Sequence, residues 1–202
     1  MPETRVTEGI FFTLSRFISN FFNPINSLFV YFVYFSIMNY HWKQAVSEFL
    51  PILLVLIIPL IAWIVWNVRK GNYSNMDVSN RIQRKSLYVA IIVLMLCYII
   101  INYLIDKQID FTMLFLFMLI FLMNFSNFFI KTSMHTAINV FAAALFFAEN
   151  TLLGWSWLAI AVVVGISRVI LKRHTPAEVF AGFLLAFIVS FAYLYTHNLL
   201  NG

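Results

Sequence analysis

The chain has 202 residues, of which 62% are hydrophobic and only 10% are charged, whereas soluble domains have roughly 45–50% apolar and about 25% charged residues. One small core cannot bury this much apolar surface, so lipid must solvate much of the chain. The net charge of +5 comes from basic residues in a few loops, where anionic lipid headgroups are the expected partners and nucleic acid is not. The lone Cys97 excludes a disulfide framework.

The first predicted element covers residues 8–22. Its apolar residues recur at helical spacing, opposite a polar face that includes Arg16 and Asn20. This pattern predicts a helix lying in the membrane interface, although a tail helix packed on a bundle fits it equally well. We therefore divide the chain into an N-terminal interfacial segment, residues 1–23, and a transmembrane domain, residues 24–202.

Seven apolar runs follow, and most have about the 20 residues that a hydrocarbon core of roughly 30 Å requires. Pro59 predicts a kink in the second run, and the fifth is short enough to be partly buried by the others. The expected fold is all-α, a multi-pass transmembrane helical bundle of six to seven spans. The runs cover residues 24–41, 49–68, 86–105, 111–130, 133–148, 153–171 and 176–197.

Counting crossings places the polar clusters relative to the membrane. Two predicted spans separate the loop before Arg84 from His135, and two more separate His135 from His174. An even number of crossings returns the chain to the same face, so these clusters share one side. That side holds most of the Lys and Arg residues, which predicts a cytoplasmic face by the positive-inside rule.

The richest polar segment lies between the last two spans. A neutral imidazole at His174 can attack phosphorus, and Glu178, four residues later, can fix its tautomer if a helix begins there. Arg168 can hold two phosphoryl oxygens in a bidentate fork. The alternative interpretation is structural, because Thr175, Pro176 and Glu178 match a capping box at a helix start. Both roles can coexist in one glutamate.

His135 belongs to a second polar segment, at the predicted start of the fifth span. A helix start points free N–H groups outward, which suits a phosphate oxygen. Ser133 can add a hydroxyl donor, and His135 can protonate a leaving group. The simpler alternative is a serine N-cap followed by a histidine at the level of the headgroups.

Metal ligands are not indicated by the sequence. There is no H-E-x-x-H motif and no paired acidic repeat, and Asp106 and Asp110 lie on the side opposite the histidines. We therefore expect no cofactor and no metal, with cationic side chains neutralising phosphate charge.

Taken together, these segments resemble the type 2 phosphatidic acid phosphatase (PAP2) family, whose signatures read K-x6-R-P, P-S-G-H and S-R-x5-H-x3-D. The resemblance looks closest to a short bacterial branch, covers most of the chain from Pro24 onward, and implies an inner-membrane protein. It implies metal-independent dephosphorylation of a lipid phosphate through a phosphohistidine. The implied roles are nucleophile for His174, orienting carboxylate for Glu178, general acid for His135, and phosphate ligands for Arg168 and Ser133.

This chain departs from each signature. The third carries Glu178 in place of aspartate, and the second carries Thr132 and Met134 in place of proline and glycine. Loss of that glycine obstructs close approach of the backbone to a phosphate.

The first signature departs most. Seven residues before Arg84 stands Asp77, not lysine, and Lys85 replaces the proline. Arg81 and Arg84 remain candidate phosphate ligands, and Lys131 is the candidate for the missing ammonium. The leading hypothesis is a membrane lipid phosphatase acting on a phosphatidic-acid-like lipid or a polyprenyl phosphate or diphosphate. The alternative is a catalytically impaired homologue that binds anionic lipid or assists assembly.

Overall fold

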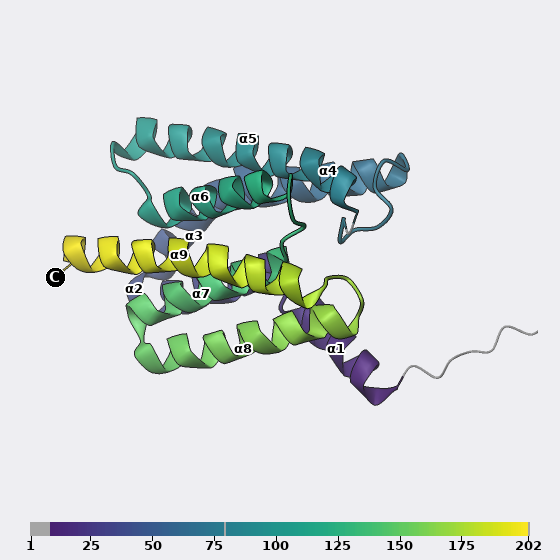
Figure 1. Cartoon of the computed structure of the whole chain (residues 1–202). Coiled ribbons are helices and arrows are strands. Elements are labelled where there is room, and N and C mark those ends of the chain that lie inside the picture. Colours follow the sequence, from purple (N-terminus) through teal and green to yellow (C-terminus); the bar gives the residue numbers. More distant parts are fainter. Residues whose placement is uncertain (1–8, 79, 202) are drawn as a thin grey trace, which may run out of the picture.

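The computed structural model describes residues 9–78 and 80–201 of the chain, and every regular element among them is helical. The helices run back and forth along one direction, as Figure 1 shows. Their bounds are α1 Ile10–Phe21, α2 Pro24–Asn39, α3 Trp42–Ile52, the π-helical turn η1 Leu53–Ile57, α4 Ile58–Arg69, α5 Arg81–Asp106, α6 Phe111–Ser126, α7 Met134–Glu149, α8 Thr151–Ile170 and α9 Pro176–Asn201.

Helix α7 is the centre of the bundle. Every residue from His135 to Phe146 is buried, and α7 packs against α2, α8 and α9. Its run Ala142–Ala144 has small side chains, which let neighbouring helix backbones approach closely. The fifth predicted span is therefore the core helix of the bundle, and its burial explains why its sequence is mostly apolar, apart from His135, Thr136 and Asn139.

Among the described residues, four helices are long and apolar enough to cross a membrane: Trp42–Arg69, α5, α8 and α9. Helices α1 and α2 meet at a bend of 56° and together form a fifth candidate span. Helices α6 and α7 have 16 residues each and are shorter than a full span. The prediction of an all-α, multi-pass membrane bundle is thus confirmed.

Two predicted elements differ in detail from the structure. The second predicted run extends back to Trp42 and contains Pro51 as well as Pro59; between them the helix loosens into η1, and Pro59 lies in the first turn of α4. The fourth predicted run ends four residues early, at Ser126, because Asn127 caps α6 and the chain turns into a loop toward α7.

Helix α1 packs against α8. It buries Ser15 and Ser19 and exposes Ile10, Leu14 and Phe17. The helix is therefore docked through its small polar residues, while its aromatic and aliphatic side chains point away from the bundle. The predicted helix is confirmed; its position in a membrane interface stays a prediction.

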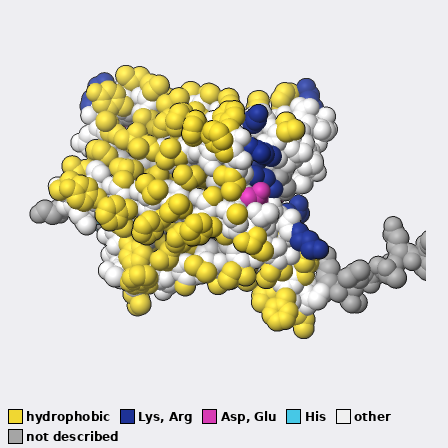
Figure 2. All heavy atoms as spheres, in the orientation of Figure 1, with side chains coloured by type: hydrophobic (Ala, Val, Ile, Leu, Met, Phe, Trp, Pro, Cys, Tyr) yellow, Lys and Arg dark blue, Asp and Glu magenta, His cyan; other side chains and the backbone are white. Residues whose placement is uncertain are grey.

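The connections α4–α5, α6–α7 and α8–α9 lie at one end of the bundle, and the connections α5–α6 and α7–α8 lie at the other (Figure 1). The face drawn in Figure 2 is largely hydrophobic, and most of its Lys and Arg side chains gather in a band toward the first of these ends. The structure thus gathers the three polar segments, as the counting of crossings predicted.

Candidate active site

His174 lies in the turn between α8 and α9 and is 6% exposed. Its Nδ1 lies 2.9 Å from Oε2 of Glu178. A carboxylate accepts the Nδ1 hydrogen, so the lone pair of a neutral imidazole is left on Nε2. The sequence prediction that Glu178 reaches His174 across one helical turn is borne out by this geometry.

The same glutamate also caps α9. Its Oε2 accepts a hydrogen bond from the backbone N–H of Thr175 at 3.2 Å, and Thr175 Oγ1 accepts one from the Glu178 N–H at 3.3 Å. This reciprocal pair is the capping box. Glu178 thus meets the geometric requirements of both sequence interpretations at once.

Arg84, on α5, faces the other side of the His174 ring. One Nη lies 3.4 Å from His174 Nε2, while the remaining donors bind the carbonyl oxygens of Thr132 and Val78 at 2.8 and 3.2 Å. Only 2% of Arg84 is exposed. This guanidinium therefore links the three connections at the polar end of the bundle and lies beside the nitrogen that would react.

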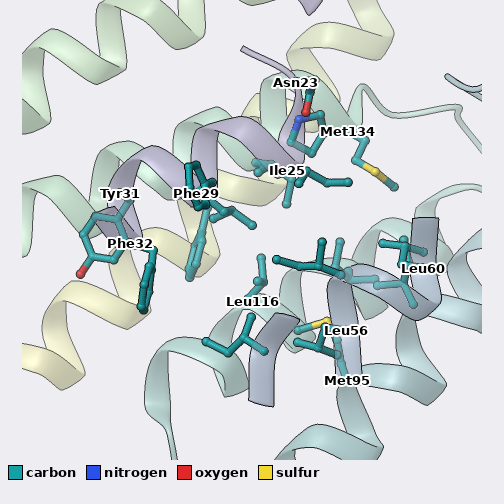
Figure 3. Close-up of a pocket in the computed structure, with 18 of the residues that line it drawn as sticks. Asn23, Ile25, Phe29, Tyr31, Phe32, Leu56, Leu60, Met95, Leu116 and Met134 are labelled. Carbon is teal, nitrogen blue, oxygen red and sulfur yellow. The ribbon is translucent and has the colours of Figure 1, made fainter. Parts of the chain in front are cut away.

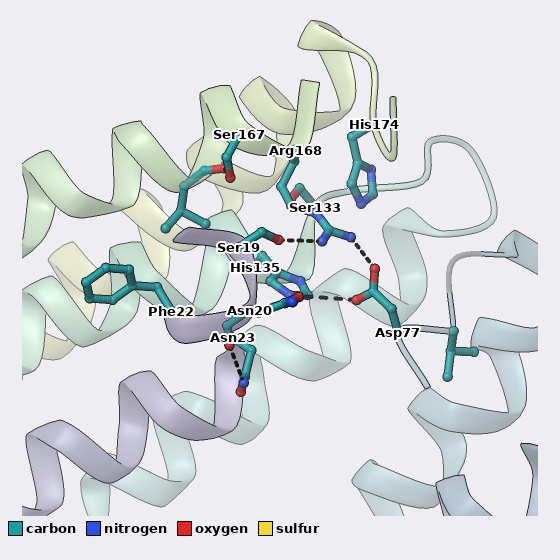
Figure 4. Close-up of polar contacts among 12 residues, drawn as sticks. Ser19, Asn20, Phe22, Asn23, Asp77, Ser133, His135, Ser167, Arg168 and His174 are labelled. Carbon is teal, nitrogen blue, oxygen red and sulfur yellow. Dashed lines mark hydrogen bonds and ion pairs between the residues drawn. The ribbon is translucent and has the colours of Figure 1, made fainter. Parts of the chain in front are cut away.

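Arg168, near the end of α8, is the second buried guanidinium. It donates to Ser19 Oγ of α1 at 2.8 Å and to Asp77 Oδ2 at 2.6 Å (Figure 4). Its Nε has no hydrogen-bond partner among the described residues. The Arg168 guanidinium thus keeps one N–H without a protein partner, and one of the two groups it binds is the carboxylate of Asp77.

Asp77 also faces His135. Its Oδ1 lies 3.6 Å from His135 Nε2, so the carboxylate is between the second histidine and Arg168 (Figure 4). Burial alone raises the pKa of Asp77, but His135 and Arg168 outweigh burial and hold that pKa below its usual value. The group is therefore an anion in the middle of a cationic site.

The hydroxyl and backbone N–H of Ser133 are engaged by other protein groups, unlike those of a free phosphate ligand. Its Oγ accepts hydrogen bonds from the N–H and Oγ1 of Thr136, at 3.4 and 3.0 Å, and its own N–H donates to the Glu178 carbonyl oxygen at 3.1 Å. The serine is fully buried. It caps α7, which is the structural alternative that the sequence left open, and its hydroxyl hydrogen is the one donor it retains for an anion.

The two remaining cationic candidates lie farther out. Lys131 donates to the backbone oxygen of Arg173, the residue before His174, at 2.8 Å, and burial, followed by Arg84, lowers the pKa of Lys131. Arg81 instead donates to the backbone oxygens of Asn127 and Phe128. That arginine holds the end of α6 and is not brought into the histidine cluster.

The imidazole of His174 is surrounded by positive charge. Burial lowers the pKa of His174 most, and Arg84 and Lys131 lower it further. A ring with a depressed pKa is neutral near pH 7 and keeps its nucleophilic lone pair.

A large cavity opens from this cluster into the bundle. It has a volume of about 1290 Å³ and reaches from Asp77, His135 and Arg168 to the opposite end of the helices. Its walls are mainly apolar, as Figure 3 shows, with lining residues that include Phe29, Phe32, Leu56, Met95 and Leu116. The cavity is polar at both ends, with Asp106 and Glu149 lining the end opposite the histidine cluster, and is mainly apolar along its length. An apolar cavity with a few polar groups suits an amphipathic ligand.

Sequence reasoning missed two residues of the site. Ser19 falls within the predicted first helix, residues 8–22, but was not singled out, and Asp77 was noted only as the residue that stands where the signature has lysine. Both contact Arg168. Within the described ranges no three His, Cys, Asp or Glu side chains gather as metal ligands.

The fold and the cluster define an integral membrane protein, all-α, with a buried histidine–arginine site at one end of its bundle. The family model of the PAP2 superfamily matches residues 111–201 of the chain. The match covers α6 to α9, with His135, Arg168, His174 and Glu178, and does not include Asp77 or Arg84. No curated protein and no solved structure matches the chain. This match supports a phosphatase-type hydrolase at the level of the superfamily.

Proposed function

We propose that this protein is a lipid phosphatase that removes phosphate from a phosphatidic-acid-like lipid or from a polyprenyl phosphate or diphosphate. The observation that carries the proposal is the His174 ring, held through Nδ1 by Glu178 with Nε2 facing Arg84. An oriented neutral imidazole next to a guanidinium is the arrangement that attack on a phosphoryl group requires.

In the first step, Nε2 of His174 forms a bond to phosphorus as the bond from phosphorus to the lipid oxygen breaks. Arg84 and Arg168 neutralise the charge on the phosphoryl oxygens. The leaving alkoxide takes a proton from His135, whose imidazolium form is favoured once a phosphate dianion lies beside it. The products are a phosphohistidine and the lipid alcohol, or a phosphohistidine and the lipid monophosphate when the substrate is a diphosphate.

In the second step, water attacks the phosphohistidine and gives its proton to His135. The bond between nitrogen and phosphorus breaks, inorganic phosphate leaves, and both histidines return to their starting states. Glu178 stabilises the positive charge that develops on the His174 ring throughout. The steps use only side chains of this protein and one water.

The large cavity supports a lipid as the substrate. Asp77, His135 and Arg168 line one end of the cavity, and its walls between the ends are mainly apolar, so a phosphate held by Arg168 would extend an acyl or prenyl chain inward. Ligand pockets usually have about 300–1,000 Å³, and the volume of about 1290 Å³ leaves room for a long chain.

The test is phosphate release by purified protein in detergent, with phosphatidic acid and a polyprenyl diphosphate as substrates and a chelator present. His174→Ala is expected to abolish release while expression and membrane insertion persist. His41→Ala, at the opposite end of the bundle, is the matched control and should keep full activity. Undiminished release by His174→Ala would end the proposal.

A second candidate function is non-enzymatic binding of anionic lipid. The ion pair between Asp77 and Arg168 favours it, because that carboxylate lies where a phosphate would be held. In the same assay, binding of anionic vesicles by the wild type without any phosphate release would support this alternative.

A further inference from the structure

Asp77 makes contacts of the kind a bound oxyanion makes. One carboxylate oxygen accepts from Arg168 at 2.6 Å, and the other lies 3.6 Å from His135 Nε2. An ionised carboxylate is an acceptor only, with two oxygens in a plane, and so resembles one edge of a phosphate. The side chain reaches this position from the loop between α4 and α5, whereas the histidines come from α7 and from the turn between α8 and α9 (Figure 4).

The other charged groups of the site have different partners and do not occupy the position of the Asp77 carboxylate. Glu178 is engaged by His174 and by the cap of α9. Among the described residues Arg84 donates to two carbonyl oxygens and lies against one imidazole, whereas Asp77 pairs directly with Arg168. Arg168 retains an unpartnered Nε, and His135 retains an unpartnered Nδ1, among the described residues. Both nitrogens are buried and can still form a hydrogen bond, and a buried polar group without a hydrogen bond destabilises the fold.

We propose that Asp77 is the internal occupant of the anion subsite, so that a phosphoryl group binds only by displacing its carboxylate from Arg168 and His135. This inference rests on the proposed function for its consequence in catalysis, but the anion subsite is tested separately. Asp77 thereby sets which phosphates the site accepts, since a ligand must hold Arg168 better than a carboxylate tethered within the same chain.

The loop that bears Asp77 is built to present it. Val78, the next residue, has φ of 44° and is fully buried, and its carbonyl oxygen accepts from Arg84. A positive φ is unfavourable for a β-branched residue and persists only where its surroundings impose it. Arg84 therefore holds the backbone next to Asp77. A phosphate that binds Arg84 would weaken its hydrogen bond to Val78 and so increase the mobility of this loop.

The test measures binding of inorganic phosphate to the full chain in detergent by calorimetry. Asp77→Asn keeps the size of the side chain and removes its charge, so phosphate should bind about tenfold tighter or more, as expected when a buried competing anion is removed. Asp106→Asn, a carboxylate at the opposite end of the bundle, is the control and should bind phosphate as the wild type does. Equal or weaker binding by Asp77→Asn would overturn the proposal and would make Asp77 a positioning residue for His135.

Hydrogen exchange of the wild type provides a measurement that needs no variant. Phosphate should increase amide exchange within residues 71–78, because displacement of Asp77 frees that loop, and unchanged or slower exchange there would argue against displacement. The outcomes also separate the two proposals. Tighter phosphate binding by Asp77→Asn with no lipid hydrolysis by any form keeps the anion subsite and ends the enzymatic proposal. Lipid hydrolysis by the wild type, with no tighter phosphate binding by Asp77→Asn, keeps the enzymatic proposal and ends the proposal about Asp77.

Discussion

The backbone N–H of Ser133 donates a hydrogen bond to the carbonyl oxygen of Glu178 at 3.1 Å. This single contact joins the first residue before α7 to the first turn of α9. His135 follows Ser133 by two residues and His174 precedes Glu178 by four, so the distance between the two proposed reacting imidazoles depends on how closely these helix starts approach.

Gly182 permits that approach. A Cβ added there would lie 2.8 Å from the carbonyl oxygen of Ser133 and 3.1 Å from its nitrogen, and backbone atoms cannot turn aside. We expect Gly182→Ala to lower the free energy of unfolding by about 1–3 kcal/mol, as overpacking does, and to reduce phosphate release strongly. Thermal melting and the release assay measure both effects. Gly9→Ala, where nothing lies within 4 Å, is the control, and wild-type values for Gly182→Ala would contradict this prediction.

Glu178→Gln separates capping from catalysis. The amide oxygen can still accept from Thr175 and from His174 Nδ1, so stability should change by less than about 1 kcal/mol. The charge that stabilises a developing imidazolium is lost, and kcat should fall on the order of a hundredfold or more. Glu178→Asp, which restores the charge, should recover part of that rate. A Gln variant with unchanged kcat would leave Glu178 with the cap alone.

Ser19→Ala tests the link from α1 to the site. Removing the hydroxyl leaves a buried guanidinium nitrogen of Arg168 without its partner, which should cost about 1–3 kcal/mol of stability and weaken substrate binding. Ser15→Ala, a buried serine one turn earlier on α1, is the matched control. If both variants melt at the same temperature, the hydrogen bond contributes nothing measurable.

The pH dependence follows from the depressed pKa of His174. A group with a folded pKa below its unfolded value of about 6.5 stays neutral as pH falls through that value, so phosphate release should not decline with a midpoint near 6.5. Arg84→Gln removes a cation that lowers this pKa and should move the acidic limb to higher pH, whatever its effect on the maximal rate. A wild-type limb with a midpoint near 6.5 would show that the ring is not held neutral.

The depressed pKa of His174 also makes the free energy of unfolding depend on pH. Because the unfolded chain binds a proton at His174 that the folded chain does not, stability is greatest above about pH 6.5 and falls as pH decreases below it. Melting temperatures of the wild type and of His174→Ala, measured between pH 5 and pH 8, should therefore converge at the acidic end. Parallel curves would contradict the shift.

The amino-acid sequence by itself determined the class of fold and one half of the site. Long apolar runs require lipid, and their lengths predict the helices. Arg168, His174 and Glu178 are close in sequence, and local helix geometry alone brings Glu178 to His174.

Only the tertiary structure decided the rest. Ser19 lies 149 residues from Arg168, and Asp77 lies 91 residues from it, so no local period connects them. Which cation each acid meets depends on how the helices pack, and packing also turned Arg81 toward the end of α6. A carboxylate buried among guanidinium groups in a low dielectric must pair with one of them. Asp77 pairs with Arg168 because the packing of the helices and of the loop before α5 brings these two side chains together.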